Sequence, residues 1–202
     1  MNTDKDDVSY DWWLEVGVTE AWAYQHELFD DDEIKAIHKI VKSFNTVKGK
    51  VGDKNAELKT DIRDSNITFF KSGHPDTDWV FERITGSIVA MNQKFWQFDL
   101  TRIETLQHSV YDVGQFYGDH VDMMYRAASR ATRKLSFTIQ LDDPKDYEGG
   151  DLLIKTSKTP DTAKKEKGTI IFFPSYVLHE VTPVTKGTRR SLVGWVSGPP
   201  FK

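Results

Sequence analysis

The sequence predicts a mainly β protein with N-terminal helices, in which two helices brace a double-stranded β-helix, or jelly roll. Apolar residues recur at helical spacing only in the first half of the chain. The second half instead contains short apolar segments separated by turn residues. Twelve Phe and six Trp among 202 residues further indicate an aromatic interior. Seven or eight short strands in such a pattern favour a sandwich or small barrel over alternating βα units.

Two helices are expected before residue 99. The first begins in the acidic run at residues 30–33, which suits a helix N-terminus, and its apolar face comprises Ile34, Ile37, Val41 and Phe44. The second runs from about Asp78 to Trp96, and its apolar residues are Phe81, Ile84, Ile88, Met91 and Phe95. Residues 47–60, between the helices, are rich in Gly, Lys and Asp and predict a long loop or mobile hairpin.

Strands are expected at residues 63–70 and then throughout the second half. Turn residues at 142–144, 148–150, 167–168 and 186–187 separate the later strands. The predicted strands of the second half are 104–111, 115–120, 134–141, 151–154, 169–173, 179–184 and 190–196.

Composition excludes several classes of protein. With no Cys, the chain cannot form disulfides, cysteine-ligated zinc sites or iron–sulfur clusters, and it has no thiol nucleophile. The net charge of −4 argues against a nucleic-acid binder, although residues 126–134 form a local basic run. The first ten residues are acidic and lack the apolar run of a signal peptide, and no apolar stretch is long enough to span a membrane. We therefore expect a soluble, cytoplasmic protein.

Three residues form a candidate metal site: His120, Asp122 and His179. Side chains two apart in a strand point the same way, and an antiparallel fold can return His179 alongside them. Two imidazoles and one carboxylate on one face, with open positions opposite, are typical of non-haem Fe(II) oxygenases, and without thiolates the set suits iron or manganese better than structural zinc. His-x-Asp alone is a weak signal, because a turn aspartate beside a surface histidine has the same spelling. His26, His38, His74 and His108 are interpreted as structural.

Arg189 and Arg190 form a second candidate feature. If the chain turns at residues 186–187, one of these arginines begins a strand and faces inward. An inward arginine is costly unless an anion meets it. Spacing alone does not decide which of the two faces inward.

Three segments together resemble a known family, the Fe(II)/2-oxoglutarate-dependent dioxygenases, in their prolyl 4-hydroxylase-like branch. Residues 111–122 (YDVGQFYGDHVD) resemble the Tyr…Gly…Tyr…His-x-Asp signature of that branch. Residues 133–152 resemble the next strand pair of that branch, and they end in the turn Glu-Gly-Gly-Asp-Leu at 148–152. Residues 168–195 resemble its final block, and the whole similarity covers about residues 104–197 in the right order.

The resemblance implies roles for individual residues. His120, Asp122 and His179 would hold the iron and so form the catalytic centre, and Arg189 would pair with the distal carboxylate of 2-oxoglutarate. Tyr111 matches a tyrosine that hydrogen-bonds the cosubstrate. Gln140 departs from the pattern, because some relatives carry a tyrosine there that contacts the same carboxylate; the contact is lost or made differently.

The function expected from this resemblance is hydroxylation of a prolyl residue in a peptide or protein, with release of succinate and CO₂. The cofactors would be Fe(II), 2-oxoglutarate and O₂, with ascorbate as reductant, and the chain would be one domain in which residues 1–98 support a catalytic core at 99–202. Tyr117, Phe137 and Trp195 are candidates for the pocket lining, but aromatic residues in a jelly roll more often belong to the plain core. Two alternatives stay open: the same cofactors acting on a free amino acid, small metabolite or nucleobase, and a non-catalytic metal-binding jelly roll.

Overall fold

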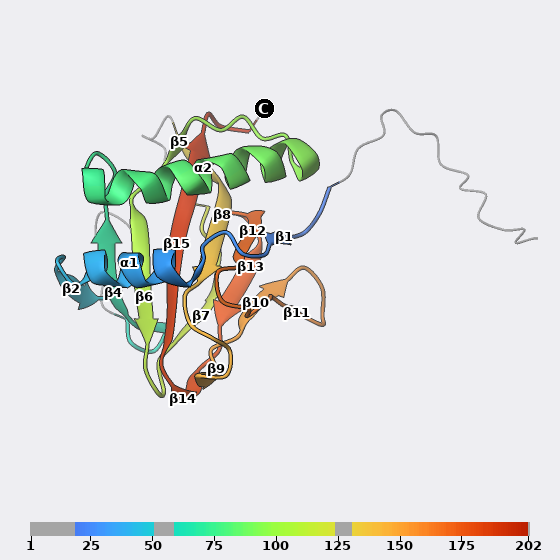
Figure 1. The fold of residues 1–202 in the computed structure, drawn as a ribbon. Helices are drawn as coiled ribbons and strands as arrows, with labels where there is room; N and C mark the ends of the chain where they lie inside the picture. Colours follow the sequence, from blue (N-terminus) through green and yellow to red (C-terminus); the bar gives the residue numbers. More distant parts are fainter. Residues whose placement is uncertain (1–18, 51–58, 124–130, 202) are drawn as a thin grey trace, which may run out of the picture.

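The computed structural model describes residues 19–50, 59–123 and 131–201, which form two helices packed against β-sheets (Figure 1). The helices are α1 (Asp31–Val41) and α2 (Pro75–Phe95). The strands are β1 (Ala23–Gln25), β2 (Thr46–Lys48), β3 (Arg63–Asp64), β4 (Asn66–Phe70), β5 (Arg102–Ile103), β6 (Leu106–Tyr111), β7 (Phe116–His120), β8 (Thr132–Gln140), β9 (Tyr147–Gly149), β10 (Leu152–Lys155), β11 (Asp161–Thr162), β12 (Ile170–Pro174), β13 (Leu178–Val181), β14 (Val184–Gly187) and β15 (Arg189–Gly198).

Two antiparallel sheets make up the barrel, which confirms the predicted fold class. The larger sheet has the order β1-β12-β8-β15-β6-β4-β2, with β5 also paired to β15. The smaller sheet has the order β11-β10-β13-β7-β3, and β14 and β9 pair separately. Most strands that are neighbours in these sheets are far apart in the sequence, as a jelly roll requires. Neither helix within the described ranges is long and apolar enough to cross a membrane.

Helix α1 begins at a capping box. The carboxylate of Asp30 accepts hydrogen bonds from the backbone N–H groups of Asp32 and Glu33, and the Glu33 side chain accepts one from the Asp30 N–H. The predicted apolar face is buried as far as Val41. Phe44 was expected on the same face, but the helix ends before it and its side chain is 36% exposed.

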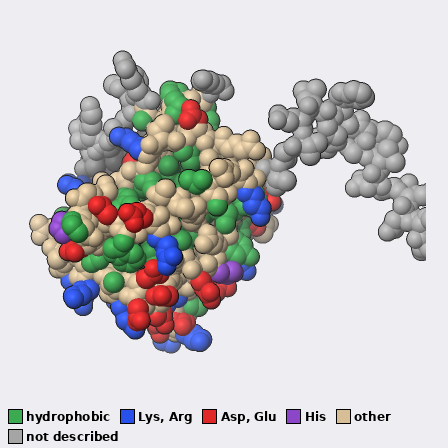
Figure 2. Space-filling model, turned by 45° about the horizontal axis from the view of Figure 1, so that its top comes forward, with side chains coloured by type: hydrophobic (Ala, Val, Ile, Leu, Met, Phe, Trp, Pro, Cys, Tyr) green, Lys and Arg blue, Asp and Glu red, His purple; other side chains and the backbone are tan. Residues whose placement is uncertain are grey.

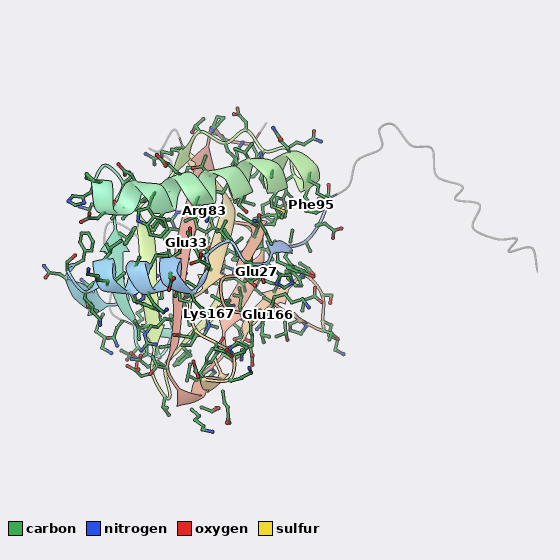
Figure 3. The ribbon with its side chains drawn as sticks, in the orientation of Figure 1. Glu27, Glu33, Arg83, Phe95, Glu166 and Lys167 are labelled. Carbon is green, nitrogen blue, oxygen red and sulfur yellow. The ribbon has the colours of Figure 1, made fainter. Side chains whose placement is uncertain are left out.

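Helix α2 begins three residues earlier than Asp78. His74 is its N-cap and Pro75 occupies the first turn, where a missing N–H costs nothing. Its buried side chains pack with those of α1 on one face of the larger sheet, and both helices cross that face in Figure 1. Glu33 of α1 and Arg83 of α2 point toward one another and form an ion pair of 2.6 Å (Figure 3).

The two faces of the larger sheet have different chemistry. Side chains alternate along each strand, and on β8 Leu135, Phe137 and Ile139 face the helices in the main hydrophobic core. The opposite face points into the barrel toward the smaller sheet. Tyr111, Ile171 and Phe173 on this face belong to a second hydrophobic cluster. The other buried residues on it are polar: Gln107, Ser109, Ser136, Thr138, Gln140 and Ser191. Charged side chains of both signs are interspersed with apolar ones on the outer surface (Figure 2). The buried polar side chains of the larger sheet thus lie on its inner face, inside the barrel.

Two sequence expectations near the first helix are wrong in part. The single strand predicted at 63–70 is divided at Ser65, because β3 pairs with β7 of the smaller sheet while β4 pairs with β6 of the larger one. The long loop or mobile hairpin predicted at 47–60 begins within strand β2, which pairs with β4. Residues 51–58 lie outside the described ranges.

Two further expectations in the second half also change. The strand predicted at 179–184 is two strands, and β14 pairs with β9, where a turn was expected. Gly149 permits this close pairing, because its φ is +70° and a Cβ there would lie 2.2 Å from the carbonyl oxygen of Pro183. Most of the basic run at 126–134 lies outside the described ranges, but Lys134 is buried in β8 and its ammonium lies over the Phe201 ring.

Candidate active site

The structure brings the three predicted metal ligands together. His120 ends β7 and His179 lies on β13, and the two residues are direct cross-strand partners. Their Nε2 atoms lie 3.9 Å and 3.5 Å from the Asp122 carboxylate oxygens. One ligand atom from each of the three side chains lies within 4.8 Å of the others. Such a cluster has the size and donor set of a mononuclear metal site.

Hydrogen bonds to the backbone set the tautomer of both histidines. The Nδ1 atom of His120 is 2.7 Å from the Gly118 carbonyl oxygen, and that of His179 is 2.9 Å from the Val177 carbonyl oxygen. A carbonyl can only accept, so each Nδ1 carries a proton, and the lone pair of a neutral ring in this orientation lies on Nε2. Both Nε2 atoms face Asp122. Metal-binding histidines are oriented in this way by a partner of the second ring nitrogen.

The protonation states of the cluster also suit a cation. Burial, with added repulsion from His179, lowers the pKa of His120 to about 4, so its ring is neutral at physiological pH. Burial works against the charged form of Asp122, but the two histidines and the nearby Trp195 and Ser136 outweigh it and lower the pKa of the carboxyl. A buried carboxylate beside the neutral His120 imidazole favours a metal ion that compensates the negative charge.

Asp122 is positioned by the bend that follows β7, although strand geometry was assumed when His120 and Asp122 were predicted to point the same way. The strand ends at His120. The backbone N–H groups of Asp122 and Met123 both donate to the Ser175 carbonyl oxygen, at 2.9 Å and 2.8 Å. Ser175 is held in turn by a 2.9 Å hydrogen bond between its hydroxyl and that of Ser136 on β8. The bend after β7 is thereby tied to the larger sheet.

Arg189 is a buried guanidinium inside the same barrel. It is 1% exposed and donates to the Gln140 side-chain oxygen at 3.0 Å and, more weakly, to the Ser191 hydroxyl at 3.4 Å. Its Nε has no partner, and it forms no ion pair with any residue that the structure describes. A buried cation without an anion is unfavourable, so the site fits a negatively charged ligand.

The strand register decides between Arg189 and Arg190. Arg190 faces the other way on β15 and pairs with Asp142, with a distance of 3.0 Å between Nη1 and Oδ1. Arg189 is the direct cross-strand partner of Tyr111, which is 3% exposed, and its guanidinium carbon lies 5.5 Å from the centre of the Tyr111 ring. Both residues expected at the cosubstrate therefore lie side by side.

The three aromatic residues considered for the pocket lie in different places. Phe137 faces the helices and belongs to the main core, so it is not in the barrel interior. Tyr117 stacks on the ring of His120, with 3.5 Å between ring centres. Trp195 lies near Asp122, and the guanidinium of Arg133 lies 4.0 Å from its ring centre.

Arg63 and Tyr147 were not among the residues predicted for the site. Arg63 is 5% exposed and lies over the Tyr117 ring, and Tyr147 is 3% exposed near Arg189. Arg63 Nη2 and the Tyr147 hydroxyl are both buried, and neither has a geometrically good hydrogen bond within the part of the chain that the structure describes. Tyr147 stood within a motif that predicted a turn, and Arg63 within a predicted strand, so neither carried a local signal of burial.

The other histidines lie outside the cluster, as expected. His74 caps α2, and His26 Nδ1 is 3.1 Å from the Thr169 hydroxyl. His38 of α1 meets His108 of β6 edge-to-face, with 5.8 Å between ring centres. His108 is buried on the helix side of the sheet.

Comparisons with known proteins agree with this geometry. Residues 106–197 match the family model described as the 2OG-Fe(II) oxygenase superfamily. A PKHD-type hydroxylase of Prochlorococcus marinus (strain MIT 9211) is 32% identical over 179 residues, covering 85% of this chain and 76% of the relative. The chain belongs to the 2OG-Fe(II) oxygenase superfamily, in its prolyl 4-hydroxylase-like branch. The resemblance noted from the motifs is thus confirmed.

Other relatives of this oxygenase match over a shorter region. A PKHD-type hydroxylase of Gloeothece citriformis (strain PCC 7424) is 42% identical over 95 residues, covering 47% of this chain and 43% of the relative. One of Acaryochloris marina (strain MBIC 11017) is 43% identical over 94 residues, covering 46% and 42%. The chain thus aligns with less than half the length of these relatives.

Solved structures share the fold of the oxygenase. A Pseudomonas putida prolyl-4-hydroxylase matches with a TM-score of 0.69 and 22% identity, over 90% of this chain and 95% of that one. A Trichoplax adhaerens prolyl hydroxylase, solved with a hypoxia inducible factor oxygen degradation domain peptide fragment, matches with a TM-score of 0.71 and 16% identity, over 87% and 83%. At these identities the likeness establishes the jelly-roll architecture.

Proposed function

We propose that the protein is an Fe(II)- and 2-oxoglutarate-dependent hydroxylase whose substrate is a prolyl residue in a peptide or protein. The observation that carries this proposal is the pairing of two features within one barrel. One is the His120, Asp122 and His179 cluster, and the other is the buried guanidinium of Arg189, which has no anionic partner within the described residues. A metal alone would not require the arginine.

The cluster fits Fe(II). Both imidazoles present Nε2 toward the Asp122 carboxylate, and three ligands from the protein leave further coordination positions for other ligands. When bound, the iron supplies the redox chemistry through which O₂ oxidises 2-oxoglutarate and the substrate C–H bond. In the balanced reaction, one oxygen atom of O₂ enters the new hydroxyl group and the other enters succinate, and CO₂ is lost. Ascorbate would act as an auxiliary reductant.

The residues of the chain hold and shield the reactants. Arg189 binds the distal carboxylate of 2-oxoglutarate through charge-assisted hydrogen bonds, and Tyr111 lies beside it as a second contact. The stacked Tyr117 restrains the His120 ring. Burial raises the pKa of Tyr117 to about 12, so this side chain remains neutral and adds no charge at the metal ligands.

The prolyl substrate is supported by the relatives. PKHD-type hydroxylases match this chain in sequence, and the protein with the same fold from Trichoplax adhaerens was solved with a peptide fragment bound. No feature of the described residues favours a free amino acid, a metabolite or a nucleobase. These alternatives are therefore outcomes of the test.

The test is incubation of the full chain with Fe(II), 2-oxoglutarate, ascorbate and a library of proline-containing peptides. The expected result is succinate release coupled to the gain of one oxygen atom on a prolyl residue, detected by mass spectrometry. Asp122→Asn should abolish both signals, while Arg190→Met should leave both in place. Hydroxylation of free proline or another small molecule, but of no peptide, would overturn the prolyl peptide assignment. Metal binding without any succinate release would indicate a non-catalytic module.

A further inference from the structure

Tyr147 is a buried phenol whose O–H has no acceptor among the residues that the structure describes. Tyr147 lies on β9 opposite Gly187 and is 3% exposed. The Lys165 ammonium lies over its ring, 4.5 Å from the ring centre. Lys165 is itself held by Asp151, at 2.9 Å. An unpartnered buried hydroxyl costs about 1–3 kcal/mol, so its retention points to a partner other than the protein.

The neighbour of this hydroxyl is Arg189. Burial raises the pKa of Tyr147, and the Arg189 guanidinium offsets that rise only in part, so the phenol remains a proton donor. The aliphatic part of Arg189 is pressed against Gly150, where a Cβ would lie 2.8 Å from Arg189 Cδ. Arg189 Nε and the Tyr147 hydroxyl are thus two buried donors on neighbouring side chains, and neither has an acceptor within the described ranges. A carboxylate has two oxygens to receive them.

Gln140 is already held by two partners from the protein. Its side-chain oxygen accepts from Arg189 Nη2 at 3.0 Å, and its Nε2 donates to the Lys164 carbonyl oxygen at 2.9 Å. The two partners fix the orientation of the amide, because a guanidinium only donates and a carbonyl only accepts. Gln140 therefore orients Arg189 through its side-chain oxygen. The N–H of its amide is donated to the Lys164 carbonyl and not to a group beside the guanidinium.

We propose that Tyr147 is a cosubstrate-binding residue, whose hydroxyl donates to the distal carboxylate of 2-oxoglutarate beside Arg189, while Gln140 is a positioning residue that acts through Arg189. This inference rests on the proposed function. It accounts for the glutamine at position 140, where some relatives carry a tyrosine: here the phenol comes from β9, and the glutamine holds the arginine instead.

The first test is the affinity of the full chain, with Mn(II) in place of Fe(II), for 2-oxoglutarate, measured by isothermal titration calorimetry. Tyr147→Phe should raise the Kd for 2-oxoglutarate roughly tenfold, the value of one hydrogen bond to a charged group. The Kd for 2-oxobutyrate, which lacks the distal carboxylate, should not change. Tyr24→Phe, at a tyrosine that is 39% exposed, is the matched control and should change neither affinity.

Equal affinity of Tyr147→Phe and the wild type for 2-oxoglutarate would overturn the role of Tyr147. An equal loss for both ligands would also overturn it, because it would show a general structural effect. If the wild type binds no 2-oxoglutarate at all, the proposed function fails first and this inference fails with it.

The second test addresses Gln140. Gln140→Glu keeps the shape of the side chain but places a carboxylate against Arg189, which then has an anion of its own. The Kd for 2-oxoglutarate should rise at least tenfold, again with 2-oxobutyrate unaffected. Unchanged 2-oxoglutarate binding in this variant would show that Gln140 does not act through Arg189.

Discussion

Replacement of Arg189 by methionine separates ligand binding from folding. The buried guanidinium makes two hydrogen bonds, to Gln140 and Ser191, and no ion pair within the described ranges. Its loss removes about 1 kcal/mol for each hydrogen bond but also relieves the burial of a charge, which costs several kcal/mol. Methionine fills most of the volume. We therefore expect the free energy of unfolding of the ligand-free protein to change by less than about 2 kcal/mol.

Ligand binding should respond far more strongly. A charge-assisted pair with a carboxylate contributes about 1.5–3 kcal/mol, or roughly 10- to 150-fold in affinity. At a 2-oxoglutarate concentration of about 100 times the wild-type Kd, the ligand stabilises the wild type by about 2.7 kcal/mol. If Arg189→Met raises the Kd about 100-fold, that stabilisation falls to about 0.4 kcal/mol. Urea denaturation of the metal-loaded protein with and without 2-oxoglutarate measures both quantities.

The neighbouring arginine provides the control. Arg190→Met removes an ion pair with Asp142 on the opposite face of β15, so it should destabilise the protein by about 1 kcal/mol and leave the ligand effect intact. If Arg189→Met kept the full stabilisation by 2-oxoglutarate, or if Arg190→Met lost it, the assignment of the inward arginine would be refuted.

Three further predictions follow from other parts of the structure. Asp122→Asn should weaken Mn(II) binding at least 100-fold in calorimetry while the circular dichroism spectrum stays unchanged. If this variant bound Mn(II) with the affinity of the wild type, Asp122 would not be a metal ligand. Burial lowers the pKa of His108 from 6.5 to about 4 in the folded protein, so as pH falls from about 6.5 to 4 only the unfolded state gains this proton and stability is lost, by up to about 3 kcal/mol. His108→Leu should flatten that part of the stability–pH curve, and an unaltered curve would contradict this account. Asp30→Ala removes the acceptor of the α1 capping box and should cost about 1 kcal/mol in thermal denaturation, whereas an unchanged melting temperature would deny the cap a role.

Local patterns were enough to predict most of the fold. The short apolar segments between turn residues in the second half and the acidic start of α1 are encoded by neighbouring residues, so strands and helix could be located without knowing their partners. The candidate metal ligands could also be predicted from the sequence, because His120 and Asp122 are close in sequence and His179 stands in a motif that resembles the family. Even so, the bend that carries Asp122 depends on Ser175, which is distant in sequence.

Pairing between distant strands decided the rest. Whether Arg189 or Arg190 faces inward depends on the register of β15 against β6 and β8, and a shift of one residue would exchange them. The division of residues 63–70 between two sheets has the same origin. Burial of the Tyr147 hydroxyl beside Arg189 arises because β9 pairs with β14 just before β15 begins. The sequence alone determined which residue types were available for the site, but only the tertiary structure decided which of them face one another, because cross-strand register is set by contacts along whole strands.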